Sequence, residues 1–359
     1  MTAAYVGDEP ALLGEAFDEE LVCTDVLSVT HDVATFVLSS PVGRLFGFRP
    51  GQYLTVHVDA SGVPLERCYT ISSAPTRPDS IAITVKRTPG GPMSNWLHDH
   101  LEVGSRLRVS GPLGDFTLDA HPATRHLFLS AGSGATPMMS MTRTLNDLPE
   151  PHDVVFVHSA RSPADIVFRG ELEQMHADGA GISVATVCET DPGDPTWSGV
   201  VGRLTRGMLE GLVPDLLERE IFMCGPPPYL ESVRVLLDEA GVDPGRVHRE
   251  SFLLGARTGP DLPAPGAAPS GVAPFSVELR RSGRTVVCDG RTTVLQAAAA
   301  AGITLPSSCG EGVCGACKTT LVAGRVDMQH GGGIRPREIA QQQVLLCCSR
   351  PLEDLVVDA

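Results

Sequence analysis

The chain has 359 residues, more than one ordinary domain core accommodates, so its length predicts two or three domains. Its hydrophobic content of 42%, charged content of 20% and mean hydropathy of +0.05 are typical of folded globular proteins and exclude a largely disordered chain. The formal net charge of -15 argues against a nucleic-acid partner, because such binding rests on Lys and Arg neutralising phosphates. An acidic surface steers basic protein partners or simply maintains solubility.

Two features of the sequence concern the cellular compartment: its targeting signals and its cysteines. No stretch reaches the ~18 consecutive apolar residues of a membrane helix, and the N-terminal segment lacks the basic and apolar regions of a signal peptide. We therefore expect a cytoplasmic protein without a membrane partner. Its ten cysteines then indicate metal binding or catalysis rather than a disulfide framework, because thiols are kept reduced in that compartment.

Residues 19–120 alternate short β-branched runs with turn residues, a pattern that favours a small antiparallel β-barrel. Near the middle of this segment, Arg67 and Tyr69 are separated by one residue and are followed by Thr70. Alternate side chains of a strand share a face, so Arg67 and Tyr69 point at one ligand, a guanidinium for phosphate and a ring for stacking. Thr70 points the opposite way or reaches the ligand through its backbone amide. A surface strand explains this short string equally well.

Residues 90–101 predict a loop followed by a helix. Two glycines, Gly90 and Gly91, lead to Ser94 and then to an apolar-periodic stretch. Such a loop delivers a helix N-terminus whose free amides hold an anionic phosphate. An ordinary capped helix is the alternative.

These two motifs together resemble the flavin-binding domain of the ferredoxin–NADP reductase superfamily. The resemblance implies that Arg67 contacts the flavin pyrophosphate, Tyr69 the isoalloxazine ring and Thr70 the flavin N5, and that Gly91 and Ser94 begin a phosphate-binding helix. It favours FAD over FMN, although relatives with the same module order use FMN.

Residues 121–258 show a different pattern, in which apolar strands alternate with helical stretches, as in a parallel α/β domain. A strand at 125–130 runs into Gly132 and Gly134, and a helix is expected at 138–148. Glycines let the backbone approach a pyrophosphate on the helix N-terminus. A second strand-to-turn element begins at 221.

Both turns resemble the nicotinamide-dinucleotide module of the same superfamily. The resemblance implies that the first turn contacts NAD(P) and that the second lies beside the nicotinamide, where Cys224 shapes the hydride-transfer site without attacking a substrate. The positions that carry it are Gly132, Gly134, Thr136, Pro137, Cys224, Gly225 and Pro226.

The choice between NADH and NADPH depends on whether a cation meets the 2′-phosphate. Arg161 follows one expected strand and Glu189 ends another. A carboxylate near the ribose repels a phosphate, so we expect NADH, with NADPH as the alternative if Arg161 faces the ribose.

Residues 259–274 are dominated by Pro, Gly and Ala, a composition that predicts a semi-flexible linker. Residues 275–359 then begin with an expected hairpin at 275–287 and an Ala-rich helix at 292–301. This order resembles the β-grasp ferredoxin domain. The expected fold is therefore multidomain: an antiparallel β-barrel, a Rossmann-like α/β domain and an α+β ferredoxin domain.

Four cysteines of this last segment predict a plant-type [2Fe–2S] cluster. The spacing is C-x4-C-x2-C in a glycine-rich loop with a fourth cysteine about thirty residues later. The expected ligands are Cys309, Cys314, Cys317 and Cys347. The resemblance selects Cys347 over Cys348, because family members carry a proline four residues after the fourth ligand, here Pro351. A structural zinc site is the rival, but it favours two C-x2-C pairs and only one is present.

The order flavin, nicotinamide, ferredoxin resembles reductase components of Rieske-type oxygenases and demethylases, including those that act on glycine betaine. It implies that hydride electrons from NAD(P)H pass through FAD and the [2Fe–2S] cluster to a partner oxygenase, with Thr70 and Cys224 at the hydride-transfer site. The rivals are a free flavin reductase or NADH oxidase, and a redox-sensing iron–sulfur protein. The ferredoxin domain argues against the first rival, and the flavin and nicotinamide motifs argue against the second.

Overall fold

The computed structural model of this chain forms two compact units, residues 1–252 and residues 253–359. It describes residues 12–13, 17–60, 63–179, 181–191, 193–251, 275–303, 305, 312, 317–330, 334 and 336–359. The predicted linker at 259–274 lies outside these residues. Among the described helices, none has both the length and the apolar character needed to cross a bilayer.

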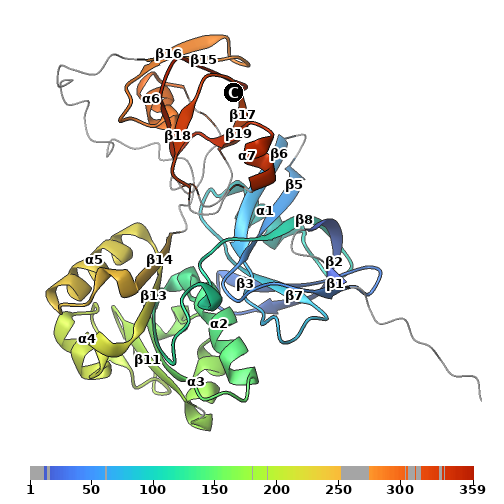
Figure 1. The fold of residues 1–359 in the computed structure, drawn as a ribbon. Coiled ribbons are helices and arrows are strands. Elements are labelled where there is room, and N and C mark those ends of the chain that lie inside the picture. Colours follow the sequence, from blue (N-terminus) through green and yellow to red (C-terminus); the bar gives the residue numbers. More distant parts are fainter. Residues whose placement is uncertain are drawn as a thin grey trace, which may run out of the picture. The chain divides into compact units, whose positions relative to one another are not determined.

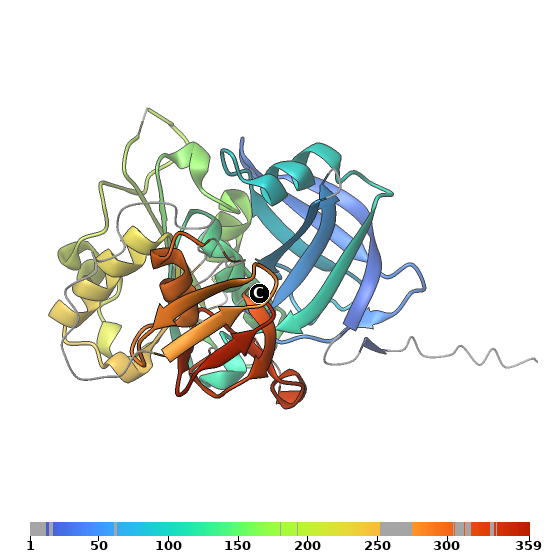
Figure 2. The same cartoon turned by 90° about the horizontal axis from the view of Figure 1, so that it is seen from above.

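A six-stranded antiparallel sheet forms the first part of unit 1, in the order β6-β5-β8-β2-β3-β7. Its strands are β2 (Phe17–Ser28), β3 (Val33–Ser39), β5 (Tyr53–Ala60), β6 (Val63–Thr70), β7 (Ile81–Lys86) and β8 (Arg106–Leu113). The sheet curls until its edges meet, because an isolated bridge joins Ile71 to Ile83 (Figure 2). A short parallel pair, β1 (Leu12–Leu13) with β4 (Leu45–Phe46), accompanies it. The predicted barrel is therefore confirmed.

The interior of this curled sheet is filled by alternate strand residues and by helix α1 (Pro92–His100), which contributes Met93 and Leu97. The expected helix thus begins two residues before Ser94. Proline suits this start, since its fixed φ is helical and the first helical amide needs no intrahelical partner.

A six-stranded parallel sheet forms the second part of unit 1, in the order β12-β11-β10-β9-β13-β14. Its strands are β9 (Arg125–Ala131), β10 (Asp153–Ala160), β11 (Ile182–Cys188), β12 (Val200–Val201), β13 (Glu220–Gly225) and β14 (Val247–Ser251). The strand order reverses between β9 and β13. Ligands of open α/β sheets bind at such a switch point, beyond the carboxyl ends of the strands.

Helices cover both faces of this sheet (Figure 1). They are α2 (Ala135–Asp147) and α3 (Arg169–Asp178) on one face, with α4 (Arg206–Leu212) and α5 (Pro227–Glu239) on the other. Helix α2 starts three residues earlier than expected. The glycine turn is itself a 3-10 helix, η2 (Gly132–Gly134), that runs directly into α2.

An aromatic row crosses the α2 face of the sheet. Phe128 lies between Phe156 and Phe222, with ring centroids 6.0 and 5.9 Å away. All three rings are fully buried. The same core reaches the antiparallel part through Val33 and Leu118, so the two sheets of unit 1 share buried apolar surface.

Helix α2 also ties the two sheets together through polar contacts. The Arg143 guanidinium donates to the Ser72 carbonyl at 2.5 Å and binds both Glu171 carboxylate oxygens at 2.8 and 2.6 Å. The Ser140 hydroxyl donates to the Ser73 carbonyl at 2.7 Å. The segment that follows Thr70 is thereby fixed against α2.

Unit 2 contains a five-stranded mixed sheet in the order β16-β15-β21-β17-β19 and a two-stranded sheet of β18 and β20. The strands are β15 (Phe275–Leu279), β16 (Arg284–Cys288), β17 (Lys318–Ala323), β18 (Val326–Met328), β19 (Gln343–Leu345), β20 (Ser349–Pro351) and β21 (Leu355–Val357). The helices are α6 (Val294–Ala300) and α7 (Pro336–Ala340).

The local sequence explains the first half of unit 2. The expected hairpin is the β15–β16 pair. The Ala-rich helix is shorter than its pattern at both ends. At its start, the Thr293 hydroxyl accepts a hydrogen bond from the Gln296 amide, and the Gln296 side chain accepts one from the Thr293 amide. This capping box fixes the start of α6.

Truncation of the central aromatic ring, Phe128→Ala, should destabilise unit 1 by ~3–5 kcal/mol, because a fully buried ring leaves a cavity. Both tryptophans, Trp96 and Trp197, lie in unit 1, so urea unfolding followed by tryptophan fluorescence reports on it. The exposed control Val201→Ala should change the unfolding free energy by less than ~0.5 kcal/mol. Equal effects of the two substitutions would contradict the central position of Phe128.

Candidate functional site

The end of strand β6 carries three of the predicted flavin residues. Arg67 and Tyr69 are half-buried, whereas Thr70 points inward and is only 4% exposed. The Arg67 guanidinium donates to the Glu66 carbonyl at 2.7 Å, which orients it along the strand. Burial raises the pKa of Tyr69, so its ring presents a neutral hydroxyl.

Thr70 meets a carboxyl group that the sequence motifs do not identify. Its hydroxyl donates to Glu250 Oε2 at 3.4 Å, although the two residues are 180 positions apart. Glu250 lies on β14 of the parallel sheet and is buried. Burial raises the pKa of Glu250 from 4.5 to about 8, and the Thr70 hydrogen bond opposes this only in part. The carboxyl group is therefore mostly protonated at neutral pH.

Glu250 is the outer member of a polar row across the parallel sheet. It is paired in register with Cys224 on β13, Cys224 with Ser130 on β9, and Ser130 with His158 on β10. The Ser130 hydroxyl lies 2.7 Å from His158 Nδ1, so these side chains share one face. Burial raises the pKa of the Cys224 thiol and lowers that of His158 to about 4, so both groups are uncharged.

The two predicted glycine turns meet at the switch point of the sheet. A Cβ on Gly134 would lie 2.2 Å from the Cys224 carbonyl oxygen, and Gly132 has a φ of +54°. A Cβ on Gly225 would lie 2.9 Å from the Tyr229 ring. Only glycine lets the backbone after β9 touch the end of β13 this closely.

Two helix N-termini follow these turns. Helix α2 carries Thr136 and Pro137, both buried, in its first turn, and the Thr136 hydroxyl donates to the Ser133 carbonyl at 3.0 Å. Pro226 is the residue before α5. No described side chain caps either helix. The start of α5 nevertheless offers no free amide, because its first two residues are prolines and the Tyr229 amide donates to the Pro226 carbonyl at 2.9 Å. The Ala135 amide at the start of α2 donates to the carbonyls of the glycine turn, so the amides left for a pyrophosphate are those of η2.

The start of α1 is held by the side chain of Ser94. The Ser94 hydroxyl is used by the chain itself, because it accepts from the Thr88 amide at 3.1 Å and donates to the Gly91 carbonyl at 3.3 Å. A Cβ on Gly91 would lie 2.7 Å from that hydroxyl. No described side chain caps the helix, so its backbone amides, rather than the Ser94 side chain, are the groups left for phosphate.

Of the four predicted cluster ligands, Cys309 and Cys314 lie outside the described residues. Cys317 and Cys347 are both buried and come together: the Cys347 amide donates to Cys317 Sγ at 3.4 Å, and the Gly312 amide donates to Cys347 Sγ at 3.2 Å. Backbone amides aimed at sulfur stabilise thiolates that carry an iron–sulfur cluster.

The neighbouring Cys348 has a different environment. It is half-buried, and its thiol points to the Leu345 carbonyl at 3.6 Å. Gly312 has a φ of +73°, and a Cβ there would lie 2.7 Å from Cys348 Sγ. The loop is therefore tight enough to require glycine, and the donor set fits a cluster bound through Cys347.

Glu250 is the main site residue that sequence reasoning missed. The only local hint of its role is that a carboxylate occupies a position in strand β14, two residues after His248, where the side chain is buried. The alternation of a short edge strand is too weak to show that this position is buried, and nothing local indicates that Thr70 is its partner.

A pH dependence of stability follows from Glu250. Its folded pKa of about 8 exceeds its unfolded value of 4.5, so the protonated carboxyl contributes fully below pH 4.5 and this contribution is lost as the pH rises towards 8. The unfolding free energy should fall by up to ~1.4 kcal/mol per pH unit in this window, and Glu250→Gln should remove this component. Urea unfolding from about pH 5 to pH 9 measures the slope. The exposed control Glu239→Gln should keep the wild-type slope, and an unchanged slope in Glu250→Gln would contradict the assignment.

Three family models match consecutive parts of the chain. They describe an oxidoreductase FAD-binding domain at residues 20–118, an oxidoreductase NAD-binding domain at residues 128–235 and a 2Fe-2S iron–sulfur cluster binding domain at residues 277–352. The predicted cofactors FAD, nicotinamide dinucleotide and [2Fe–2S] are thus confirmed at the level of domains.

Similar proteins span nearly the whole chain. The glycine betaine monooxygenase reductase subunit of Pseudomonas aeruginosa is 43% identical, over 94% of each chain. The stachydrine N-demethylase reductase subunit of Rhizobium meliloti is 40% identical, over 95% of this chain and 96% of its own. The solved structure of phthalate dioxygenase reductase matches with a TM-score of 0.58 and 27% identity, over 95% of this chain and 98% of its own. The chain therefore belongs to the ferredoxin–NADP reductase superfamily, among the NAD(P)H-dependent oxidoreductases that carry a C-terminal [2Fe–2S] ferredoxin domain.

Proposed function

We propose that this protein is the reductase component of an oxygenase system, passing electrons from NADH through FAD and a [2Fe–2S] cluster to a partner oxygenase. The names of its relatives support a monooxygenase or demethylase partner that acts on a methylated amine, such as glycine betaine or stachydrine. A Rieske-type centre in that partner is part of our proposal. The cytoplasm is the compartment that fits, because it supplies NADH and keeps thiols reduced.

The observation that carries this proposal is the contact between Thr70 and Glu250. It joins the end of the flavin-domain strand to the carboxyl end of the nicotinamide-domain sheet at 3.4 Å, beside Cys224. Residues at this contact would hold FAD, which would supply hydride acceptance from a nicotinamide and one-electron release. The chain supplies placement: Thr70 directs a hydroxyl to the site, and protonated Glu250 holds a proton at Oε1 or Oε2 away from water.

The flavin half of the site uses groups on β6 and α1. Arg67 neutralises phosphate charge, the Tyr69 ring stacks on the isoalloxazine, and the first amides of α1, which follow Gly91 and include that of Ser94, bind the pyrophosphate. These are our assignments for the predicted flavin residues. The half-buried positions of Arg67 and Tyr69 support them, since both remain accessible to a ligand.

The nicotinamide half uses the two glycine turns. We assign the dinucleotide pyrophosphate to Gly132, Gly134 and the first turn of α2 with Thr136 and Pro137, and the nicotinamide to Cys224, Gly225 and Pro226. The uncharged Cys224 thiol offers an apolar, polarisable surface rather than a nucleophile. Water is excluded there because Cys224 and Ser130 are fully buried.

Cluster binding is assigned to Cys309, Cys314, Cys317 and Cys347. A [2Fe–2S] cluster held by four thiolates carries single electrons, which suits a one-electron acceptor. Amide-to-sulfur hydrogen bonds at Cys317 and Cys347 support this ligand set. They also stabilise negative charge on the sulfurs.

The preference for NADH is proposed from charges at the carboxyl ends of β10 and β11. Glu189 follows β11 and pairs with Arg203 at 3.2 Å. Arg161 follows β10 and lies 3.8 Å from Asp32 and 3.5 Å from Asp165. Both guanidinium groups at these strand ends, those of Arg161 and Arg203, are thus already matched by carboxylates, which disfavours a 2′-phosphate.

Replacement of Glu189 by a cation tests this preference. Glu189→Arg should raise the ratio of kcat/KM for NADPH to that for NADH by roughly tenfold or more, the value of one charge-assisted hydrogen bond. Steady-state reduction of ferricyanide with each nucleotide measures the ratio. The control Arg203→Ala removes the ion pair but keeps the carboxylate, so it should retain the NADH preference. If only Arg161→Ala altered the ratio, the ribose would lie at β10 instead.

Adjacent cysteines provide a matched test of the cluster and of the electron path. Cys347→Ser should abolish the visible [2Fe–2S] absorbance and the NADH-driven turnover of the partner oxygenase, while Cys348→Ser should keep both. Both variants should still reduce ferricyanide with NADH, since that step needs only the flavin. Oxygenase turnover that survives in a cluster-free Cys347→Ser protein would overturn the proposed path.

A further inference from the structure

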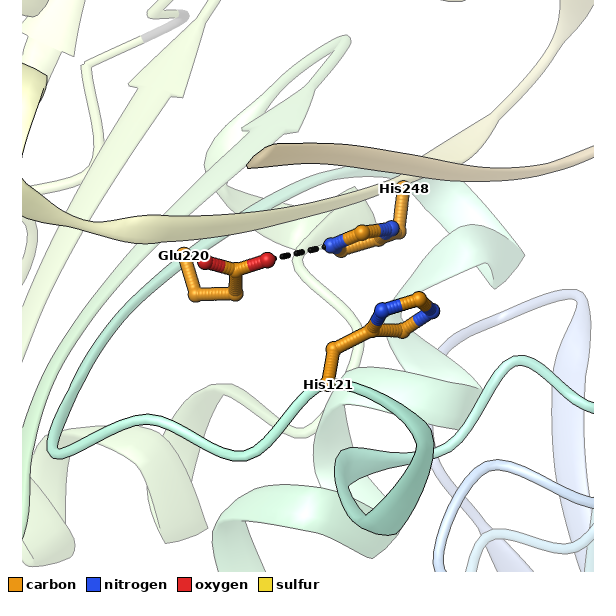
Figure 3. A group of neighbouring side chains, drawn as sticks. All are labelled: His121, Glu220 and His248. Atoms are coloured by element: carbon orange, nitrogen blue, oxygen red, sulfur yellow. Dashed lines mark hydrogen bonds and ion pairs between the residues drawn. The ribbon is translucent and has the colours of Figure 1, made fainter. Parts of the chain in front are cut away.

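A cluster of two histidines and one glutamate lies away from the site described above. His121 follows the 3-10 helix η1 (Leu118–Ala120), Glu220 is the first residue of β13, and His248 lies near the start of β14 (Figure 3). Cys224 and Gly225, in contrast, are at the carboxyl end of β13. The cluster therefore occupies the opposite end of these strands from the nicotinamide turns.

The three side chains converge closely. His248 Nε2 lies 2.6 Å from Glu220 Oε1, and the His121 ring stacks on the His248 ring with centroids 3.4 Å apart and planes inclined by 15°. One nitrogen or oxygen from each residue lies within 4.8 Å of those of the other two. All three residues are half-buried, so the cluster is sheltered but open to small solutes.

We propose that His121, Glu220 and His248 form a binding site for a divalent transition-metal ion, with Zn²⁺ as the ion that this ligand set favours. Two imidazoles and one carboxylate are a familiar zinc donor set, and water completes the coordination in such sites. Half-burial leaves room for that fourth ligand.

Zinc binding requires a small local rearrangement. Ligand atoms around tetrahedral zinc lie about 3.3 Å apart, given metal–ligand distances of ~2.0–2.2 Å. The ion therefore replaces the proton between His248 Nε2 and Glu220 Oε1, and the carboxylate moves back from its 2.6 Å contact. The His121 ring rotates out of the stack to direct a nitrogen at the ion. Its place after η1, outside a strand, allows this rotation.

The surroundings support the ligands without occupying them. Arg246 Nε lies 3.5 Å from Glu220 Oε2, so it orients the carboxylate through the oxygen that does not face His248. The Phe222 ring backs both imidazoles, 5.9 Å from His121 and 5.1 Å from His248. The guanidinium also lowers cation affinity, so we expect micromolar rather than nanomolar zinc binding. A bound ion would fix the segment between the two sheets of unit 1 to β13 and β14.

Equilibrium dialysis of the FAD- and cluster-loaded full chain against micromolar zinc, with bound metal counted by mass spectrometry, tests the site. The wild type should bind one zinc equivalent more than His121→Phe, which keeps a stacked ring but removes the nitrogen ligands. The control His100→Phe makes the same change where a histidine stacks on Trp96, and should keep the wild-type zinc content. Zinc held by cysteines is common to all three proteins and cancels in this comparison.

Thermal unfolding supplies a second readout. Zinc should raise the melting midpoint of the wild type and of His100→Phe but not that of His121→Phe, and without zinc the three midpoints should agree because each retains its stacked ring. Equal zinc content in wild type and His121→Phe, or an equal zinc-dependent shift in both, would overturn the proposal. The outcome is independent of electron transfer, because none of the substituted residues lies in the flavin or nicotinamide site.

Discussion

A buried carboxyl group that bridges two sheets is the constraint on which the proposed hydride-transfer site depends. Glu250 lies near the end of β14 in the parallel sheet and Thr70 ends β6 of the antiparallel sheet. Their side chains meet at 3.4 Å, so the site depends on how the two sheets pack. A charged carboxylate would be costly in this environment, and the protein keeps it neutral by raising its pKa to about 8. The packing of α2 on both sheets, through Arg143 and Ser140, holds this arrangement.

Around that contact, the chain contributes position and electrostatics rather than reactive side chains. Cys224 and His158 are uncharged and fully buried, so neither acts as a nucleophile or a base towards solvent. The groups available to phosphate are backbone amides at the starts of α1 and of η2, where no described side chain competes for them. Redox chemistry then resides in the cofactors, and the fold governs which of their atoms meet.

Turns and strand ends could be predicted from the sequence because they depend on residues that are neighbours in the chain. Gly132 and Gly134 mark a turn that favours glycine, and the structure gives two reasons: Gly132 has a φ of +54°, and a Cβ placed on Gly134 would lie 2.2 Å from the Cys224 carbonyl oxygen. Arg67, Tyr69 and Thr70 lie at the end of one strand, as their β-branched and aromatic surroundings indicate. The helix start expected near Gly91 and Ser94 also rests on local residues, and the structure adds that the Ser94 hydroxyl bonds to the Thr88 amide and the Gly91 carbonyl, neighbours that only the folded turn brings within reach.

The cysteine spacing, the glycine turns and the periodicity of strands and helices were enough to predict the order of three domains and the cofactors. Each of these signals lies in residues that are close together in the chain. Only the tertiary structure decided that Glu250 faces Thr70, that Cys224 aligns with Ser130 and His158, and that His121 stacks on His248. These pairings join residues separated by 28 to 180 positions. They depend on strand order and register, which arise from the packing of whole sheets and leave no periodic signal in the residues concerned.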